Sequence, residues 1–446
     1  MPYIPHTPSD RERMARTIGI EDIDELFDSV PESLRLAEPL NLPPPLSEME
    51  LIRELSLIAR RNRGVDYYTS FLGAGAYDHF IPSAVRHIVG RSEFYTSYTP
   101  YQAEISQGML QVIYEFQSMI CALTGMDIAN ASVYDGATAT AEAAIMALNK
   151  SGRRRVLVSQ LVNPHYRAVV ETYLSQGLAA LEIVRASEGS TSQEELQSLL
   201  DEDTACLVVQ YPNFVGTIED IGAYSKMCDS AGASLVVVAD PIALGILKPP
   251  GALGADIVVG EGQSLGNPLN YGGPYLGFMA AREDYLRYIP GRISGATVDT
   301  EGNRGYVLTL QAREQHIRRE RAYSNICTNQ ALNALAATVY LSLMGKSGLR
   351  KVAELCLQKA HYLADRLSSI DGVSLAYTAP FFKEFVVRTP LPADKVVSEL
   401  RKHRILAGEP LGPHYPDMDN CLLVCVTEKR TRDEMDEFAE RLGEIL

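Results

Sequence analysis

The sequence predicts an α/β protein with a mainly parallel sheet, followed by a smaller α+β unit. Between residues 137 and 280, short apolar runs alternate with segments of helical periodicity. The runs are rich in Val, Leu and Ile on both faces, which is typical of strands covered by helices on both sides. After residue 328 this alternation is replaced by long helical stretches.

The elements follow in a regular order along the chain. We expect strands at 155–158, 181–184, 206–210, 234–240, 256–259 and 276–280, with helices at 137–148, 166–174, 193–200 and 221–231. Beyond them we expect helices at 329–343 and 349–368, a strand at 421–426 and a helix at 432–446. The predicted domains are an N-terminal helical arm (1–65), a large α/β domain (66–328) and a small C-terminal α+β domain (329–446).

Two helix-start signals define the N-terminal arm. Thr7-Pro8-Ser9-Asp10 offers an N-cap followed by proline and an acid, and Ser47-Glu48-Met49-Glu50 fits a capping box. The proline-rich stretch 41–46 between them is incompatible with a helix. An arm this short has too little core to fold alone, so we expect it to cover the main domain or a partner.

Composition excludes several functional classes. The 446 residues carry a net charge of −15 and are 46% hydrophobic, which indicates a folded chain that anionic nucleic acids and membrane surfaces repel. The first ten residues show no secretory pattern, and the seven scattered cysteines suit a reducing compartment, so we expect a cytoplasmic protein. The eight histidines show no metal-binding spacing, and no metal is expected.

Asp240 and Gln263 bear on cofactor chemistry. Ligands of open α/β sheets bind at the carboxyl ends of strands, where Asp240 stands. Asp240 either caps a turn or pairs with the pyridine nitrogen of pyridoxal 5′-phosphate (PLP). A PLP enzyme also needs a lysine for the Schiff base, but no lysine lies between Lys248 and Lys346, and the loop after the next strand offers Gln263 instead. A PLP fold here would therefore lack its anchoring base.

Two helix starts and an aromatic segment are further candidates. The start at Gly136 and Thr138 either holds an anion on its backbone N–H groups or is an ordinary N-cap. His165, at the next helix start, either stacks on a ring or is a surface histidine. The segment 95–104 holds three phenols and no basic residue, which argues against nucleic-acid stacking and favours an interface or a site wall. Its candidate residues are Tyr95, Tyr98, Tyr101, Gln102 and Glu104.

The string from Tyr98 to Gly108 resembles the hallmark Y-T-P-Y-Q-x-E-x-S-Q-G of the glycine cleavage system P-protein (glycine decarboxylase) family. The similarity continues at 117–132, at Asp135-Gly136, at Gly272-Gly273-Pro274 and at 318–328. The resemblance implies the fold type I, aspartate-aminotransferase-like PLP-transferase fold. It further implies the first of two homologous halves, of which only the second carries the lysine. The chain thus looks like subunit 1 (α) of the split prokaryotic form.

The resemblance also implies a division of labour. Gln263 would stand at the Schiff-base lysine position, with Asp240, His165, Gly136 and Thr138 as a vestigial site and no cofactor bound covalently. PLP on a β partner (subunit 2) would accept the electrons released as CO2 leaves glycine, and the aminomethyl group would pass to the lipoyl arm of the H-protein. The assembly would be α2β2, and this chain alone would be inactive.

Within that picture, Tyr95, Tyr98 and Tyr101, with Gln102 or Glu104 as a polar member, would line the partner's site. Two alternatives remain open at this point. The chain could be a non-catalytic structural or regulatory subunit, or a self-sufficient PLP enzyme that uses a lysine such as Lys248.

Overall fold

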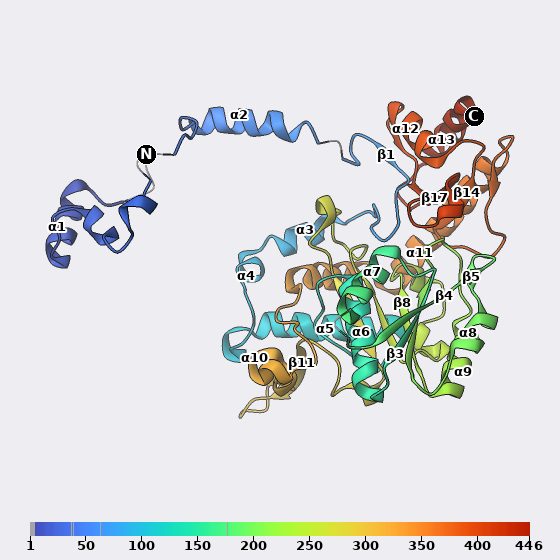
Figure 1. Ribbon diagram of the computed structural model, residues 1–446, viewed down its shortest axis with the longest axis horizontal. Helices are drawn as coiled ribbons and strands as arrows, with labels where there is room; N and C mark the ends of the chain where they lie inside the picture. Colours follow the sequence, from blue (N-terminus) through green and yellow to red (C-terminus); the bar gives the residue numbers. More distant parts are fainter. Residues whose placement is uncertain (1–4, 37, 39, 63, 176) are drawn as a thin grey trace. The chain divides into compact units, whose positions relative to one another are not determined.

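The computed structural model describes residues 5–36, 38, 40–62, 64–175 and 177–446. The chain divides into two compact units, residues 1–63 and 64–446, each of which is described by itself (Figure 1).

The described residues of the N-terminal unit form helices and turns and enclose no core. It contains α1 (Pro8–Ile18), η1 (Ile23–Phe27), η2 (Glu32–Leu34) and α2 (Glu48–Ala59). Both predicted helix starts are confirmed, because Thr7 and Ser47 each form a complete capping box. None of the described residues between 5 and 62 is buried, and α2 exposes an apolar stripe that includes Leu51, Ile52 and Leu55.

A seven-stranded sheet organises the second unit, in the order β2-β10-β9-β8-β7-β3-β4. The strands are β2 (Ile128–Ala129), β3 (Arg155–Ser159), β4 (Ala180–Val184), β7 (Thr204–Tyr211), β8 (Ser234–Ala239), β9 (Ile257–Glu261) and β10 (Gly277–Ala281). The pairs from β9 to β4 are parallel, as predicted. β10 instead runs antiparallel to β9, since residues 262–276 contain turns but no crossover helix to bring the chain back to the starting edge.

Alternate residues of the strands bury two separate cores. The helices of this unit are α3 (Ser83–Val89), α4 (Ser92–Tyr95), α5 (Gln107–Thr124), α6 (Gly136–Ser151), α7 (Pro164–Leu174), α8 (Gln193–Leu199), α9 (Ile221–Ala231), α10 (Gln315–Arg318), α11 (Ala331–Ser368), α12 (Ala393–Lys402) and α13 (Arg432–Ile445). Val236 and Val238 of β8 belong to the cluster that includes residues of α6 and α7, whereas Leu235 and Val237 belong to the cluster that includes residues of α5, α9 and α11. The two helices expected at 329–343 and 349–368 are the two parts of α11, separated by a non-helical Gly345.

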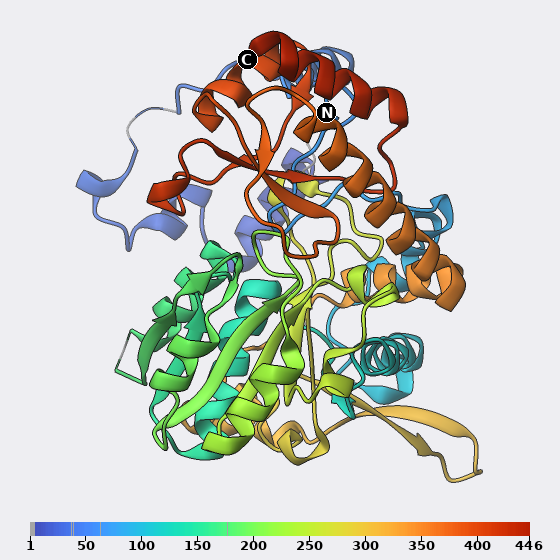
Figure 2. The ribbon, with the colours of Figure 1, turned by 90° about the vertical axis from the view of Figure 1, so that its right-hand side faces the viewer.

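A second sheet forms near the C-terminus, in the order β13-β14-β17-β16. Its strands are β13 (Ser374–Leu375), β14 (Glu384–Arg388), β16 (Glu409–Pro410) and β17 (Cys421–Cys425). Together with α12, α13 and the end of α11 it encloses a third core, which includes Phe385, Val424 and Phe438 (Figure 2). Short pairings outside these sheets join β1 (Thr69–Ser70) to β15 (Ile405–Leu406), β5 (Ala186–Ser187) to β6 (Ser190–Thr191), and β11 (Ile293–Val298) to β12 (Arg304–Thr309).

The C-terminal sheet meets the carboxyl edge of the large sheet at Gly216, in the loop after β7. Gly216 has φ +90°, and a Cβ there would lie 2.0 Å from the carbonyl oxygen of Glu384, the first residue of β14. Only glycine allows the two backbones to approach this closely. The contact places the start of β14 directly against the strand ends where ligands of α/β sheets bind.

All seven cysteines are free thiols, and no helix among the described residues is long and apolar enough to cross a membrane.

Glu142 of α6 gives a testable pH dependence of stability. Burial raises the pKa of its carboxyl from 4.5 to about 7, against an opposing hydrogen bond from Ser324. The folded state therefore binds the Glu142 proton more tightly than the unfolded state does. The protonated side chain stabilises the fold fully below pH 4.5, and this stabilisation is lost as the pH rises to about 7. Because glutamine does not ionise, Glu142→Gln should avoid the loss of unfolding free energy, on the order of 3 kcal/mol, that wild type undergoes over this pH range.

The measurement is the difference in thermal unfolding midpoint between Glu142→Gln and wild type at pH 5 and at pH 8. We expect the difference to shift in favour of the variant at pH 8. An equal difference at both pH values would contradict the assignment.

Candidate functional site

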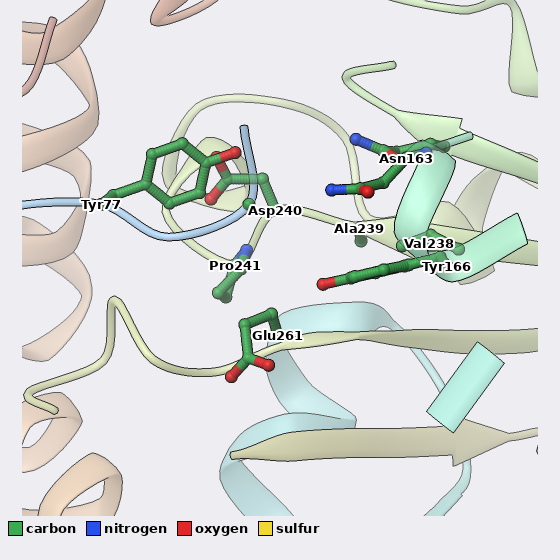
Figure 3. Close-up of a pocket in the computed structure, with 10 residues that line it drawn as sticks. Tyr77, Asn163, Tyr166, Val238, Ala239, Asp240, Pro241 and Glu261 are labelled. Carbon is green, nitrogen blue, oxygen red and sulfur yellow. The ribbon is translucent and has the colours of Figure 1, made fainter. Parts of the chain in front are cut away.

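A small cavity lies at the carboxyl edge of the large sheet, where the strand ends, α7 and the segment 75–77 meet (Figure 3). Its volume is about 30 Å³. It is lined by Gly75, Tyr77, Asn163, Tyr166, Gln210, Val238, Ala239, Asp240, Pro241 and Glu261.

Asp240 follows β8 and makes two kinds of contact. Its Oδ1 accepts a hydrogen bond from the Ile242 N–H at 2.9 Å, which is the turn-capping role. Its Oδ2 lies 2.7 Å from Nζ of Lys383, in an ion pair whose side chains are 11% and 1% exposed. The carboxylate that could have faced a cofactor is thus paired with a lysine of this chain.

Lys383 immediately precedes β14 and comes from the C-terminal sheet. Its Nζ lies 3.2 Å from Nε2 of His79 and 3.4 Å from the centre of the Tyr77 ring. Burial alone would lower the pKa of Lys383, but the Asp240 carboxylate, 2.7 Å from Nζ, outweighs burial and raises the pKa. The ion pair with Asp240 therefore favours the charged form of this buried lysine.

Glu261, the last residue of β9, lies against the N-terminus of α6. Its Oε2 accepts a hydrogen bond from the Gly136 N–H at 2.9 Å, and its Oε1 accepts from the N–H groups of Gln263 at 3.0 Å and Leu276 at 2.9 Å. A Cβ at position 136 would lie 2.4 Å from the Tyr166 hydroxyl, so glycine is needed for this approach. Burial raises the pKa of Glu261 to about 7, although the three backbone donors oppose the shift.

Gln263 is 2% exposed and its amide is fully engaged. Oε1 accepts a hydrogen bond from the Tyr77 N–H at 2.9 Å, while Nε2 donates to the carbonyl oxygens of Tyr77 at 3.1 Å and Asn267 at 2.7 Å. Gln263 therefore clasps the segment around Tyr77 to the loop after β9.

The structure brings together some of the predicted site residues and separates others. Asp240 lines the cavity, whereas Gly136 and Gln263 lie behind the lining and donate their N–H groups to Glu261. Thr138 donates its N–H to the N-cap Asp135 at 2.7 Å and does not line the cavity. His165 is exposed, with its ring edge-on to that of His414 at 5.8 Å, and does not line it either.

Sequence reasoning missed four residues of the site: Tyr77, Tyr166, Glu261 and Lys383. Glu261 had a usable signal, because an acid at the end of an apolar strand lies where ligands bind. Lys383 had none, since it lies 143 positions from Asp240 along the chain and only the tertiary fold joins them.

The residues present do not fit PLP. A cavity of about 30 Å³ has room for a water molecule or two, whereas pockets for cofactor-sized ligands have roughly 300–1,000 Å³. Glu261 already uses the α6 donor that a phosphate would need, and Lys383 already pairs with the carboxylate that a pyridinium would need. No step of the chemistry is therefore assigned to a cofactor in this cavity.

His79, Cys356 and Glu428 form a neighbouring cluster whose ligand atoms lie within 4.8 Å of one another. His79 Nδ1 and Glu428 Oε2 are 2.6 Å apart, and burial together with Lys383 lowers the pKa of His79. The Lys383 ammonium occupies Nε2 of the ring and repels a metal cation. These three side chains therefore form part of the buried polar network around Lys383 and not a metal site.

The tyrosine segment lies apart from this cavity and faces solvent. Tyr95, Tyr98 and Tyr101 are 57%, 77% and 52% exposed, and Gln102 and Glu104 are exposed too. Buried Arg292 supports the segment by donating from Nη2 to the Tyr101 hydroxyl at 3.1 Å. Beside it, a hollow of about 550 Å³ is lined by α3, α4 and the start of α5. The aromatic side chains are thus displayed rather than packed into this chain.

Solved structures define the class of protein. The chain superposes on a sphingosine-1-phosphate lyase from Burkholderia pseudomallei with a TM-score of 0.66 at 15% identity, over 92% of each chain. It superposes on a NifS-like protein with a TM-score of 0.63 at 14% identity, over 84% of this chain and 98% of the other. With the mainly parallel sheet and its carboxyl-edge cavity, these likenesses establish the fold type I PLP-transferase fold.

The chain belongs to the glycine cleavage system P-protein family, whose model matches residues 1–442. It is 56% identical over 445 residues to a probable glycine dehydrogenase (decarboxylating) subunit 1 of Desulforamulus reducens, covering 100% of both chains. The crystal structure of a glycine decarboxylase (P-protein) in inhibitor-bound form matches with a TM-score of 0.93 at 43% identity, over 100% of both chains.

Restoring a lysine alone should not restore cofactor binding. In Gln263→Lys, we expect no visible absorption band of lysine-bound PLP after incubation and dialysis, because Glu261 and Lys383 still occupy the polar contacts. Wild type with surface-bound PLP removed by dialysis is the control. A stoichiometric band that borohydride fixes on residue 263 would show that the rest of the site is open.

Proposed function

We propose that the chain is subunit 1 of a two-subunit glycine dehydrogenase (decarboxylating) and acts in the cytoplasm. The second subunit holds PLP, and the lipoylated H-protein accepts the product, in an α2β2 assembly. The seven free thiols suit a reducing compartment.

In the proposed reaction glycine supplies the electrons and the lipoyl disulfide of the H-protein accepts them. The Cα–carboxyl bond of glycine breaks and releases CO2, and the electron pair left on the aminomethyl carbon forms a C–S bond to one lipoyl sulfur. The lipoyl S–S bond breaks, and the other sulfur takes up a proton and becomes a thiol. The partner's PLP supplies the electron sink for the loss of CO2. This chain supplies no covalent step.

The observation that carries the proposal is the state of this chain's own pocket. In a family of PLP-type folds, a chain with Gln263 clasped to Tyr77 and Lys383 paired with Asp240 has neither a nucleophilic amine nor space for the cofactor. Full-length similarity to proteins named subunit 1 supports a role beside a cofactor-bearing partner.

The tyrosine segment is the proposed contribution to the partner's site. Three exposed phenol rings lie beside an open hollow, and exposed aromatic side chains of this kind are typical of binding surfaces. Hydroxyl groups in a dried pocket orient a carboxylate without leaving bulk water as a proton source. Gln102 or Glu104 would be the polar member. Arg292 would hold Tyr101 in place.

Reconstitution tests the division of labour. The purified chain should show no PLP absorption band and no exchange of label between bicarbonate and the glycine carboxyl group. Mixing it with the second subunit, PLP and lipoylated H-protein should give exchange. Turnover by this chain alone would refute the proposal and favour a self-sufficient enzyme.

Removing hydroxyl groups tests the site wall. Tyr98→Phe and Tyr101→Phe should lower the turnover of the assembled complex on the order of 10-fold or more, because substrate orientation is lost while ring packing is kept. Assembly should be unchanged by size-exclusion chromatography.

The matched control is Tyr377→Phe, a half-buried tyrosine beside the C-terminal sheet whose hydroxyl contacts Met418. It should leave turnover unchanged. If both segment variants keep the full rate and glycine affinity, the chain is a scaffold and not part of the site.

A further inference from the structure

The cavity at the sheet edge is closed by charges of the same sign as those a phosphorylated pyridine would bring. The Glu261 carboxylate lies at the α6 N-terminus, where backbone N–H groups and the helix dipole favour an anion. The Lys383 ammonium lies against Asp240, where a protonated ring nitrogen would otherwise be stabilised. Both positions are therefore filled by side chains of this chain: Lys383 pairs with Asp240, and Glu261, with its pKa raised to about 7, is a carboxylate at the α6 N-terminus above that pH.

Several contacts fix Glu261 and Lys383 in these two positions. Glu261 is held by three separate backbone donors, from Gly136, Gln263 and Leu276. Lys383 is 1% exposed and contacts His79 and the face of Tyr77 as well as Asp240. Tyr77 is itself fixed, since its hydroxyl donates to Glu384 Oε2 at 2.9 Å and its backbone is clasped by Gln263.

We propose that this is a self-liganded site: Glu261 stands in for the phosphate and Lys383 for the ring cation, and together they exclude free PLP from this chain. The absence of a lysine at position 263 would by itself only prevent covalent attachment, and a phosphorylated pyridine could still bind noncovalently. The two stand-in charges close that route. Exclusion of PLP from this chain does not depend on the proposed reaction.

The probe is pyridoxamine 5′-phosphate, which has no aldehyde and so reports noncovalent binding without reacting with surface lysines. Equilibrium dialysis of full-length wild type should show no saturable binding at millimolar concentration. The double variant Glu261→Ala/Lys383→Ala, which vacates both positions, should bind at least about tenfold more tightly than wild type. Saturable micromolar binding by wild type would overturn the proposal.

The single variant Glu261→Ala isolates the anion position and guards against misfolding of the double variant. It frees the N–H groups of Gly136, Gln263 and Leu276, so inorganic phosphate should raise its thermal unfolding midpoint in a saturable manner. Wild type should show no such rise. A Glu261→Ala protein that keeps the wild-type circular dichroism spectrum but gains no phosphate response would show that its carboxylate does not stand in for an anion.

The matched control is Glu142→Ala/Lys359→Ala. Glu142 is 2% exposed and lies on α6, and Lys359 donates to the Glu428 carbonyl oxygen, but neither lines the cavity. The control should gain no binding of either probe. A gain equal to that of the Glu261 and Lys383 variants would assign the effect to general loosening and reject the proposal.

Discussion

The ion pair between Asp240 and Lys383 joins the two sheets of the second unit. Asp240 directly follows a central strand of the large sheet, and Lys383 directly precedes a strand of the C-terminal sheet, so the pair crosses the junction where ligands of this fold bind. Breaking such a pair leaves an uncompensated buried charge, which costs about 3–5 kcal/mol. The positions of His79, Tyr77 and Glu384 follow from it, because each contacts the ammonium or its immediate neighbours.

A fold can keep its shape after its chemistry has moved elsewhere, provided that the buried polar positions find new partners. Here the strand ends and helix N-terminus of a cofactor fold are retained, while carboxylate and ammonium side chains satisfy them internally. What remains available for function is the exposed surface, above all the tyrosine segment supported by Arg292. The proposed role beside a PLP-bearing subunit uses that surface and not the cavity.

Much of the fold could be predicted from local pattern. Strands buried on both faces give continuous apolar runs, which is why β3, β7 and β8 were located to within a few residues, and capping chemistry located α1 and α2. The antiparallel direction of β10 could not be predicted, because parallel and antiparallel strands can have the same apolar composition. Of the candidate site, Asp240 and Gln263 were readable from their positions after strands. Of the predicted residues only Asp240 lines the cavity: Gln263 contacts the lining residue Glu261, and His165 and Thr138 do not line it either.

The sequence by itself determined that no imine can form after β9, because an amide at position 263 is not a nucleophile in any conformation. It also determined the α/β class, since periodicity and capping act within a few residues. Only the tertiary structure decided that the pocket is closed, because Lys383 and Glu261 reach it from a distant strand and a neighbouring strand end. Lys383 and Glu261 meet their partners only in the folded chain, so their pairing leaves no local pattern in the sequence.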